Sequence, residues 1–412
     1  MLAEIVTIGD ELCRGEVVDT NSSFMASELW DMGITCTWMT SCRDDRADMI
    51  QAFRTALRRA SAVLVSGGLG PTEDDLTVDV LAEAAGVGVT TDPGALERLK
   101  ARFAKAGYAL TPNNLRQVRV PEGAVVFPNP KGLAPGFELR LGDAVVLAMP
   151  GVPRELTAIW AQSVAPRLAE LAAGGEKIAK RTFRVFGLAE AHIDHKLAGL
   201  SSLADHATVH YQVAFPETLV KLVVRDRDAE AAAQKLAMLE RELRMRLGQA
   251  VYGEGGDSLP SVLGRALHER GESVVVAESC TGGMLGSILT EVPGSSRYFH
   301  GGWITYTNEA KLRELGVRED TLRHHGAVSE QCTSEMARGA RERAGSTYAV
   351  AISGIAGPGG GTPEKPVGTV HVAMAGPGSL RHKHYVFPGE RDQVRRLACY
   401  WAMAMILREV TQ

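Results

Sequence analysis

A serine, a tyrosine and a lysine in the last third of the chain are of types that can perform nucleophilic catalysis. Ser279 comes directly after the apolar segment 274–277, and a serine hydroxyl attacks a carbonyl carbon when a base removes its proton. Lys311 is the candidate base, because a lysine removed from water has a lowered pKa. Tyr306 lies in the same stretch, GGWITYTNEAK, which would have to fold over Ser279. The residues alone leave two alternatives open, namely that Ser279 caps a helix and that Lys311 is a solvated helix lysine.

Three further turns in this region carry groups that suit a phosphate or an oxyanion. The sequence PGSS at 293–296 offers hydroxyls, and SGIAGPGGG at 353–361 can bring backbone N–H groups close to a ligand. The sequence GER at 389–391 supplies a cation. Turn chemistry or surface charge would explain each of them equally well. No Ser-His-Asp triad is apparent, since His324 and His325 lie in a polar stretch where surface positions are expected.

The first part of the chain contains a glycine-rich loop, SGGLGPTEDD at 66–75, directly after an apolar segment. Glycines allow the backbone to approach a phosphate, and Asp74 and Asp75 can ligate a hard divalent cation. A tight strand-to-helix turn with an acidic helix start is an equally good explanation. Four other polar stretches favour a binding site, and the first and last of them follow predicted strands, whose loops gather at the carboxyl edge of a parallel sheet. They are IGDELCRG at 8–15, TPNN at 111–114, NPKGLAPG at 129–136 and PGVPRE at 150–155.

The elements that must position these loops follow an alternating pattern of strands and helices. Short, uniformly apolar segments separated by helical patterns predict an α/β fold with a parallel sheet covered on both faces. In the first part we expect strands at 3–8, 62–66 and 144–148, with helices at 22–32, up to 85 and up to 172. A second such pattern has strands at 273–277, 349–353 and 368–373, and helices at 259–270 and 392–408.

Glycine-rich stretches divide the chain into three expected domains, at 1–173, 178–252 and 259–412. The hinge is expected at 174–176 and a polar linker at 253–258. The middle segment predicts a small α+β module with strands at 181–186 and 219–224 and helices at 189–200 and 229–247. It contains no chemical motif, so we expect it to act as a spacer or an interface.

Composition excludes several classes of protein. The chain has 412 residues, of which 45% are hydrophobic and 23% charged, so collagen-like, coiled-coil and wholly disordered structures are excluded. A formal net charge of −4 argues weakly against broad nucleic-acid binding. No apolar run approaches the ~20 residues of a membrane helix, and the N-terminus does not resemble a secretory signal. Six cysteines without a CxxC pair indicate reduced thiols, so we expect a cytoplasmic protein.

Together, the N-terminal motifs resemble the CinA family, whose first domain is similar to the molybdopterin-binding fold. That wider fold often has GGTG where this chain has GGLG, and Leu69 therefore favours the CinA branch over molybdopterin binding. The resemblance implies cleavage of ADP-ribose to AMP and ribose 5-phosphate with a divalent metal (Mg, Mn or Co), with K⁺ as an additional candidate. It places the metal at Asp74 and Asp75. The substrate residues it implies are Asp10, Glu11, Asn21, Gly67, Gly68, Gly70, Thr72, Asn113, Lys131, Gly151 and Glu155.

The C-terminal motifs ESCTGG, PGSS, YTNEAK, GAVSE, SGIAGPGGG and KPVGTV are similar to the nicotinamide mononucleotide deamidase domain of the same family. The resemblance implies hydrolysis of the carboxamide to nicotinate mononucleotide and ammonia, without a cofactor. It makes Ser279, Tyr306 and Lys311 catalytic, with an oxyanion role for Ser296. The family's Thr before GIAGP is Ser353 here, and Arg395 lies close to the implied Arg391. The substrate residues it implies are Thr281, Gly282, Gly283, Ser296, Ser353, Gly354 and Arg391.

The resemblance thus implies a cytoplasmic hydrolase of pyridine-nucleotide salvage in three parts, with a KH-like middle module. Family members are often dimeric, so a homodimer is expected, with small-molecule substrates and no membrane partner. Two rival functions stay open. One is a binding protein for a molybdopterin-like ligand that performs no hydrolysis. The other is a competence-associated scaffold with decayed active sites.

Overall fold

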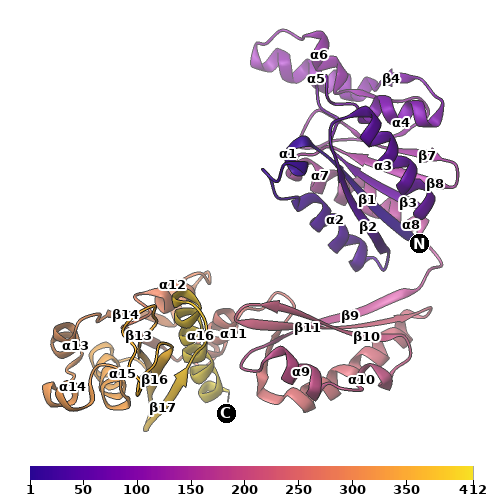
Figure 1. Ribbon diagram of the computed structural model, residues 1–412. Coiled ribbons are helices and arrows are strands. Elements are labelled where there is room, and N and C mark those ends of the chain that lie inside the picture. The colour runs from indigo at the N-terminus through magenta and orange to yellow at the C-terminus, as the bar shows by residue number, and fades with distance from the viewer. Residues whose placement is uncertain (412) are drawn as a thin grey trace. The chain divides into compact units, whose positions relative to one another are not determined.

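The computed structural model describes residues 1–411 and separates them into two units. The first unit contains Met1–Ile178 together with Arg225–Ala229, and the second contains Ala179–Val224 and the chain from Glu230 onwards. The glycines predicted as a hinge at 174–176 lie just before this boundary (Figure 1). None of the helices in the described residues is both long enough and apolar enough to cross a membrane.

The first unit is built on a six-stranded sheet with the order β2-β1-β3-β8-β7-β6. The central strands run parallel, as predicted, whereas β7 is antiparallel to β8 and β6 is antiparallel to β7. The strands are β1 (Leu2–Ile8), β2 (Thr35–Cys42), β3 (Ala62–Ser66), β6 (Val125–Phe127), β7 (Gly136–Leu141) and β8 (Ala144–Met149).

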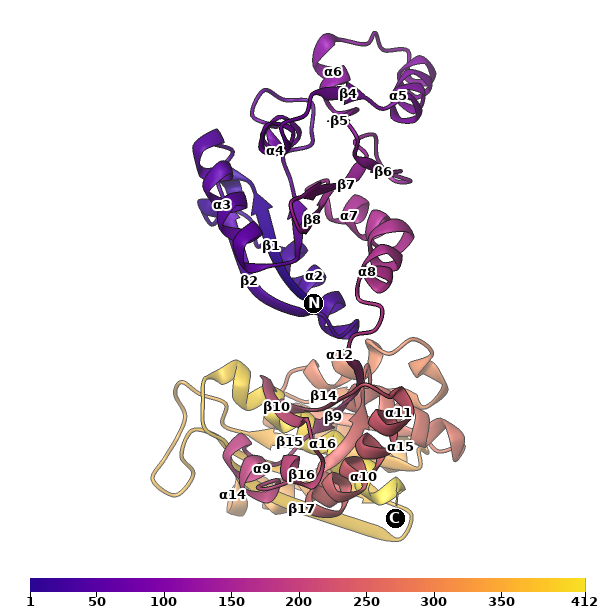
Figure 2. The same ribbon diagram turned by 90° about the vertical axis from the view of Figure 1, so that its right-hand side faces the viewer.

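Helices cover both faces of this sheet, because its central strands are apolar on both sides. On one face, Phe53 and Leu81 of α3 and α4 pack on Val63 and Val65; on the other, α2, α7 and α8 pack on Leu64. Figure 2 shows α3 on one side of the sheet and α7 and α8 on the other. The helices are α1 (Asp10–Cys13), α2 (Thr20–Asp31), α3 (Arg46–Arg59), α4 (Thr77–Ala85), α7 (Pro153–Ile159) and α8 (Ala165–Leu171).

A small lobe of the first unit has a core of its own, formed by Ala95, Leu99 and Val118. It consists of α5 (Pro93–Ala106), α6 (Pro112–Arg116) and the antiparallel pair β4 (Val89–Thr91) and β5 (Arg119–Pro121). Leu133, from the loop before β7, packs against this core. The lobe therefore contacts the loop that contains Lys131.

The second unit begins with a four-stranded sheet of order β10-β11-β9-β12 and the helices α9 (Glu190–Lys196) and α10 (Ala229–Leu247). Its strands are β9 (Lys177–Val185), β10 (Ala207–Ala214), β11 (Glu217–Asp226) and β12 (Val251–Glu254). The linker predicted at 253–258 is shorter than expected, because Gly253 and Glu254 pair with β9. Asp257 accepts a hydrogen bond from the Glu254 N–H at 2.9 Å, so the remaining residues form a closed turn.

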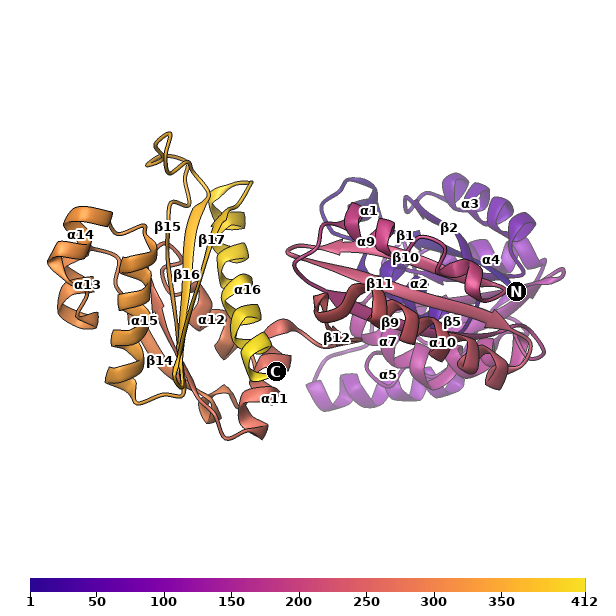
Figure 3. The same cartoon turned by 90° about the horizontal axis from the view of Figure 1, so that it is seen from below.

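The C-terminal part is a second mixed sheet of order β14-β13-β15-β16-β17. The first three of these strands are parallel and the last two antiparallel. Figure 3 shows α15 and α16 on opposite faces of the sheet. The strands are β13 (Val274–Glu278), β14 (Phe299–Ile304), β15 (Tyr348–Gly354), β16 (Thr369–Gly376) and β17 (Ser379–Val386). The helices are α11 (Leu259–Glu269), α12 (Met284–Thr290), α13 (Asn308–Leu315), α14 (Glu319–His325), α15 (Glu330–Ala344) and α16 (Arg391–Val410).

Candidate functional site

Ser279 and Lys311 form a buried pair at the carboxyl edge of the C-terminal sheet. Ser279 follows β13, and Lys311 lies on α13, one element after β14. The Lys311 Nζ donates hydrogen bonds to Ser279 Oγ at 3.1 Å and to the Thr305 carbonyl at 2.7 Å. Ser279 is 9% exposed and Lys311 is 1% exposed, so the solvated-lysine alternative is wrong.

The surroundings of Lys311 favour its uncharged form. Burial lowers the pKa of the amine, while the Cys332 and Cys280 thiols act weakly in the opposite direction. Among residues 1–411, no carboxylate forms an ion pair with Lys311. A neutral amine beside a hydroxyl can accept its proton, and the pair is therefore arranged for nucleophilic chemistry.

Glu278, rather than Ser279, caps the following helix. The side chain of Glu278 is 1% exposed, and its carboxylate accepts hydrogen bonds from the N–H groups of Gly283, Leu285 and Gly286 at 2.9, 3.1 and 2.8 Å. The helix α12 begins at Met284, with Gly283 as its N-cap in a left-handed conformation at φ 94°. The helix-cap explanation of Ser279 is therefore wrong, because its oxygen accepts from Lys311 instead.

Two arginines of α16 contact the loops around this pair. Arg391 donates to the Gly357 carbonyl at 2.7 Å and to the Tyr306 hydroxyl at 3.0 Å. Arg395 donates to the Thr281 carbonyl at 2.7 Å, so it contacts the 279–283 loop directly. Tyr306 is 58% exposed, and the hydrogen bond of its hydroxyl goes to Arg391 rather than to Ser279 or Lys311.

Of the other residues predicted for this site, several belong to loops in contact with the Ser279 loop, whereas Ser296 does not. The Ser279 N–H donates to the Ile352 carbonyl at 3.0 Å, which places Ser353 and Gly354 next to the pair. The Ser353 hydroxyl donates to the Ala327 carbonyl at 2.7 Å and so holds the 326–330 loop. Thr281 is fully buried, and Gly282 precedes the cap of α12. Ser296 lies exposed in the short 3-10 turn Ser295–Arg297, and no hydrogen bond connects it to the Ser279 loop.

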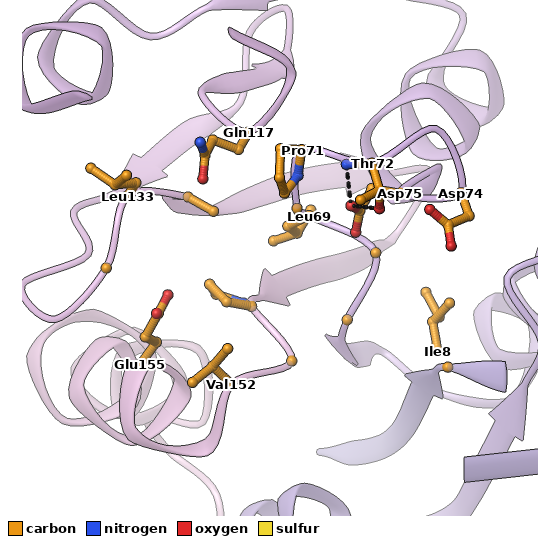
Figure 4. Close-up of a pocket in the computed structure, with 18 of the residues that line it drawn as sticks. Ile8, Leu69, Pro71, Thr72, Asp74, Asp75, Gln117, Leu133, Val152 and Glu155 are labelled. Carbon is orange, nitrogen blue, oxygen red and sulfur yellow. Dashed lines mark hydrogen bonds between the residues drawn. The ribbon is translucent and has the colours of Figure 1, made fainter. Parts of the chain in front are cut away.

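A cavity of about 460 Å³ opens at the carboxyl edge of the N-terminal sheet (Figure 4). Most of the N-terminal residues predicted from the sequence line it: Glu11, Gly67, Gly68, Gly70, Thr72, Asp74, Asp75, Lys131, Gly151 and Glu155. Asp10, Asn21 and Asn113 do not. Asp10 forms an ion pair with Arg14, and Asn113 is exposed on α6.

Glycines in the 67–70 loop are required by close packing of the backbone. Gly67 has a φ of 109°, and a Cβ there would lie 2.3 Å from the Ile8 carbonyl oxygen. Gly68 has a φ of 65°, and its Cβ would lie 2.2 Å from Thr77 Oγ1, which donates to the Gly67 carbonyl at 2.9 Å. The loop is therefore fixed against the end of β1 and the start of α4, with Leu69 buried below it.

The two aspartates predicted as metal ligands have different surroundings. The Asp75 carboxylate accepts from the Thr72 N–H at 2.8 Å and from its hydroxyl at 2.6 Å, which closes the 72–75 turn (Figure 4). Asp74 is exposed to solvent. Asp74 is thus an ionised ligand open to a cation, whereas Asp75 is occupied in shaping the turn.

The side chains of Asn129 and Asn21 hold the loops around this cavity in place, although neither residue lines it. Asn129, a buried residue that the sequence reasoning missed, donates to Glu155 at 2.8 Å, and its carbonyl oxygen accepts from the Lys131 and Gly132 N–H groups. Asn21 donates to Ser66 Oγ at 3.0 Å and to the Gly151 carbonyl at 2.7 Å. Asn21 therefore connects two loops of the site, although it does not line the cavity.

Sequence reasoning also missed several residues that line the cavity, namely Asp44, Arg102, Gln117 and Arg154. Burial raises the pKa of Asp44, and the neighbouring carboxylates of Glu11, Asp10 and Asp74 raise it further. Asp44 follows β2, so the rule that ligands bind at the carboxyl ends of parallel strands would have found it. That strand was not recognised, because half of its sequence TCTWMTSC is Thr or Ser and most of it is exposed.

The donor set fits a divalent cation that arrives with a phosphate ligand. Residues 1–411 contain no group of three or more His, Cys, Asp or Glu arranged to hold a metal ion. Mg²⁺ is usually held by one or two carboxylates, with substrate phosphates and water completing its shell. Asp74, with Asp44 and Glu11 on the same cavity wall, provides such carboxylates. A bound cation would supply charge neutralisation for phosphoryl transfer.

Comparison with protein families divides the chain into three matches. Residues 4–170 match the family described as a probable molybdopterin binding domain, and 180–253 match the damage-inducible protein CinA KH domain. Residues 256–410 match the CinA C-terminal domain.

Full-length relatives agree with these matches. The chain is 42% identical over 405 residues to a CinA-like protein of Anaeromyxobacter sp. (strain Fw109-5), and 40% identical over 405 residues to one of Geobacter sulfurreducens. Each comparison covers 98% of both chains. A CinA superfamily structure from Klebsiella pneumoniae is 38% identical and covers 37% of this chain and 96% of its own, with a TM-score of 0.36.

Proposed function

Because the chain belongs to the CinA family, with molybdopterin-binding-like, KH and CinA C-terminal domains, we propose that its C-terminal domain deamidates nicotinamide mononucleotide. The products are nicotinate mononucleotide and ammonia. The observation that carries this proposal is the buried contact between Lys311 Nζ and Ser279 Oγ, at 3.1 Å. It is the arrangement that an amidohydrolase with a lysine base requires.

In the proposed reaction, neutral Lys311 takes the proton of Ser279 as the serine oxygen attacks the carboxamide carbon. As the tetrahedral intermediate collapses and the C–N bond breaks, the Lys311 ammonium gives its proton to the departing NH2 group, which leaves as ammonia. Water attacks the resulting ester with Lys311 again as base, which releases the acid and restores the hydroxyl. Backbone N–H groups beside Ser279 stabilise the oxyanion, and Tyr306 with Arg391 binds the substrate. The structure does not connect Ser296 to the Ser279 loop, so Ser296 has no part in this proposal.

The test is to incubate purified protein with nicotinamide mononucleotide and to measure both ammonia and nicotinate mononucleotide. Ser279→Ala should abolish product formation, and Lys311→Arg should do the same, because a guanidinium stays protonated. Lys383→Arg is the matched control, since Lys383 is exposed on β17, an element that contains neither Ser279 nor Lys311. Turnover by Ser279→Ala protein free of contaminating enzyme would refute the nucleophile.

The N-terminal cavity supports a second proposed activity, metal-dependent cleavage of ADP-ribose to AMP and ribose 5-phosphate. Lys131 and the 67–70 loop bind the diphosphate, and Asp74 holds the cation that neutralises its developing charge. Asp74→Asn should lower the rate of AMP release about 100-fold or more. Tight binding of ADP-ribose or of a molybdopterin-like ligand without any hydrolysis would instead support a binding protein.

We also propose a cytoplasmic homodimer. Light scattering of the purified full-length chain should give twice the 44.1 kDa of one chain. A monomer at assay concentration would contradict the dimer without affecting either proposed reaction.

A further inference from the structure

The last helix, α16, contacts both the Ser279 site and the KH domain. Near its N-terminus, Arg391 and Arg395 donate hydrogen bonds to Tyr306, Gly357 and Thr281, as described above. Further along the helix, Tyr400 and Trp401 contact the KH domain. The distance between these two regions is short, because each helical residue adds about 1.5 Å.

Phe186 is the main contact from the KH domain. It follows β9 and is 4% exposed, and it packs with the core of the C-terminal domain rather than with that of its own domain. Its ring centroid lies 5.1 Å from that of Trp401 and 5.6 Å from that of Tyr400. A Cβ at the adjacent Gly187 would lie 3.1 Å from the Trp401 ring, so the backbone is also in close contact. Such aromatic contacts fix the orientation of the rings relative to one another and also bury apolar surface.

A buried carboxylate strengthens the same contact. Glu217, at the start of β11, is 6% exposed and accepts hydrogen bonds from Arg184 at 3.2 Å and from the Tyr252 hydroxyl. Burial and then Glu217 raise the pKa of Tyr400 to about 12, which keeps the phenol protonated beside the carboxylate. The contact between the KH domain and α16 is therefore mainly aromatic and apolar, and the Tyr400 phenol lies beside a buried carboxylate.

The opposite face of α16 explains why a loss of Phe186 would move the helix without unfolding it. Ala398, Cys399, Ala402 and Met403 are completely buried in the C-terminal core. With that face held, removal of the outer contact leaves the helix folded but less constrained in position. Arg395 would then hold the Thr281 carbonyl less firmly, and with it the loop that contains Ser279.

We propose that the KH domain is a positioning element of the Ser279 site and that Phe186 is the positioning residue, which acts through α16 and Arg395. Only the kinetic consequence of this inference rests on the proposed deamidase function. The middle domain thereby acquires a role in the reaction, although it has no chemical group near the reacting atoms.

The test compares full-length Phe186→Ala, Phe186→Leu and Phe215→Ala proteins. Phe215 is a matched control, because it belongs to the same domain and is 45% exposed. Phe186→Ala should lower kcat for nicotinamide mononucleotide on the order of tenfold with KM little changed, since a small misplacement of a catalytic group is costly. Phe186→Leu should restore most of the rate, and Phe215→Ala should match the wild type. An unchanged kcat in folded Phe186→Ala protein would overturn the proposal.

Hydrogen exchange separates this proposal from the proposed reaction. Amides of 279–286 should exchange about tenfold faster in Phe186→Ala than in wild type or Phe215→Ala, because local opening becomes easier. If the wild-type protein fails to deamidate nicotinamide mononucleotide, the proposed function is wrong, and the exchange rates then decide the positioning role. In that case, unchanged exchange of the 279–286 amides would overturn the positioning role of Phe186.

Discussion

Lys311 has two hydrogen-bond acceptors and is nearly inaccessible to water. Its neutral form loses little by burial, whereas its charged form would lose hydration without gaining an anionic partner. The proton affinity of the amine is therefore set mainly by the packing of α13 against the sheet. At the scale of single residues, this is the physical basis of the proposed chemistry.

Non-additivity provides the first test of that basis. Ser279→Ala and Lys311→Ala should each remove nearly all deamidation, and the double variant should be little slower than either single variant. The reason is that neither group accelerates the reaction without the other. Rates measured for the four proteins should form this pattern; independent, multiplying losses would contradict a shared catalytic unit.

The pH dependence of the reaction provides the second test. Burial lowers the pKa of Lys311 below the ordinary 10.5, so the active neutral amine forms at a lower pH than in a solvated lysine. We expect kcat/KM to rise with pH and to level off below pH 10.5. A rate that still rises in step with free-lysine titration would exclude Lys311 as the base, and Lys383→Arg should leave the profile unchanged.

Sequence reasoning found Ser279 and Lys311, because each lies in a short polar motif beside an apolar element. It missed Glu278 for a physical reason: a carboxylate at the end of an apolar strand is read as the first exposed residue, whereas this one is buried against three N–H groups. Anionic side chains are favoured at helix N-termini, and that preference was the available signal. The partner of Tyr306, Arg391, lies 85 residues away, a separation no local pattern encodes.

At the scale of elements, the strands that the sequence predicted in the two α/β domains are buried on both faces over most of their length, whereas β9 and β11, which were also predicted, are only partly buried. All residues of β3, β8 and β13 are buried, and each is a short apolar run. The strands that were missed include β2, β10, β12, β14 and β17, all at sheet edges. In edge strands, apolar and polar residues alternate or polar residues predominate, as in the half-exposed HGG of β14. A search for uniformly apolar segments therefore cannot find them.

The start of α12 depends on one carboxylate, and this gives a third prediction. Glu278→Gln should destabilise the protein by about 1.5–3 kcal/mol, because three charge-assisted hydrogen bonds are weakened at a buried position. Deamidation should fall as the 279–283 loop loses its shape. Thermal unfolding and turnover should be compared with Glu291→Gln, whose carboxylate is exposed just after the helix. Equal stabilities would contradict the capping role.

Strands β16 and β17 contain three neighbouring histidines that should make stability depend on pH. His371 stacks on His384 and shares a 2.9 Å hydrogen bond with His382, and Glu330 lies 3.5 Å from His382. Burial, then His382, His384 and Lys365, lower the pKa of His371 to about 4. Between pH 6.5 and 4 the unfolded chain binds more protons than the native one, so stability falls as pH falls through this window.

The measurement for this fourth prediction is urea unfolding at several pH values. The wild type should lose about 1–2 kcal/mol between pH 6.5 and 4 through His371, after allowance for its partial exposure. His371→Gln should flatten that part of the curve, whereas replacement of the exposed His324 should not. If the stability of His371→Gln falls as steeply with pH as that of the wild type, groups other than His371 cause the pH dependence.

At the scale of the whole molecule, the two candidate sites lie in different units and differ in their side chains. The N-terminal cavity contains carboxylates suited to a cation, and the Ser279 site contains a base and hydrogen-bond donors. The resemblance at sequence level implied both activities. The association of the KH domain with the C-terminal domain in one unit was not foreseen, because its main contact, Phe186, is an ordinary apolar residue at a strand end.

A chelator should therefore separate the two reactions, which is the fifth prediction. Excess chelator should abolish ADP-ribose cleavage, since phosphoryl charge would be left without its cation, and should leave deamidation unchanged. Both reactions are measured on the same preparation, with Mg²⁺ restored at the end as the control. Parallel loss of both activities would contradict the assignment of separate chemistries.

The small exposed area of Ser279 has a consequence for inhibitor discovery. An electrophile that reacts with Ser279 must reach a hydroxyl on a residue that is only 9% exposed, so a bulky group close to its reactive atom would block access. A compact sulfonyl fluoride should label Ser279, whereas its biotinylated counterpart should not. Labelling surveys with large reagents would accordingly overlook this protein, and selective covalent ligands for Ser279 would have to be small.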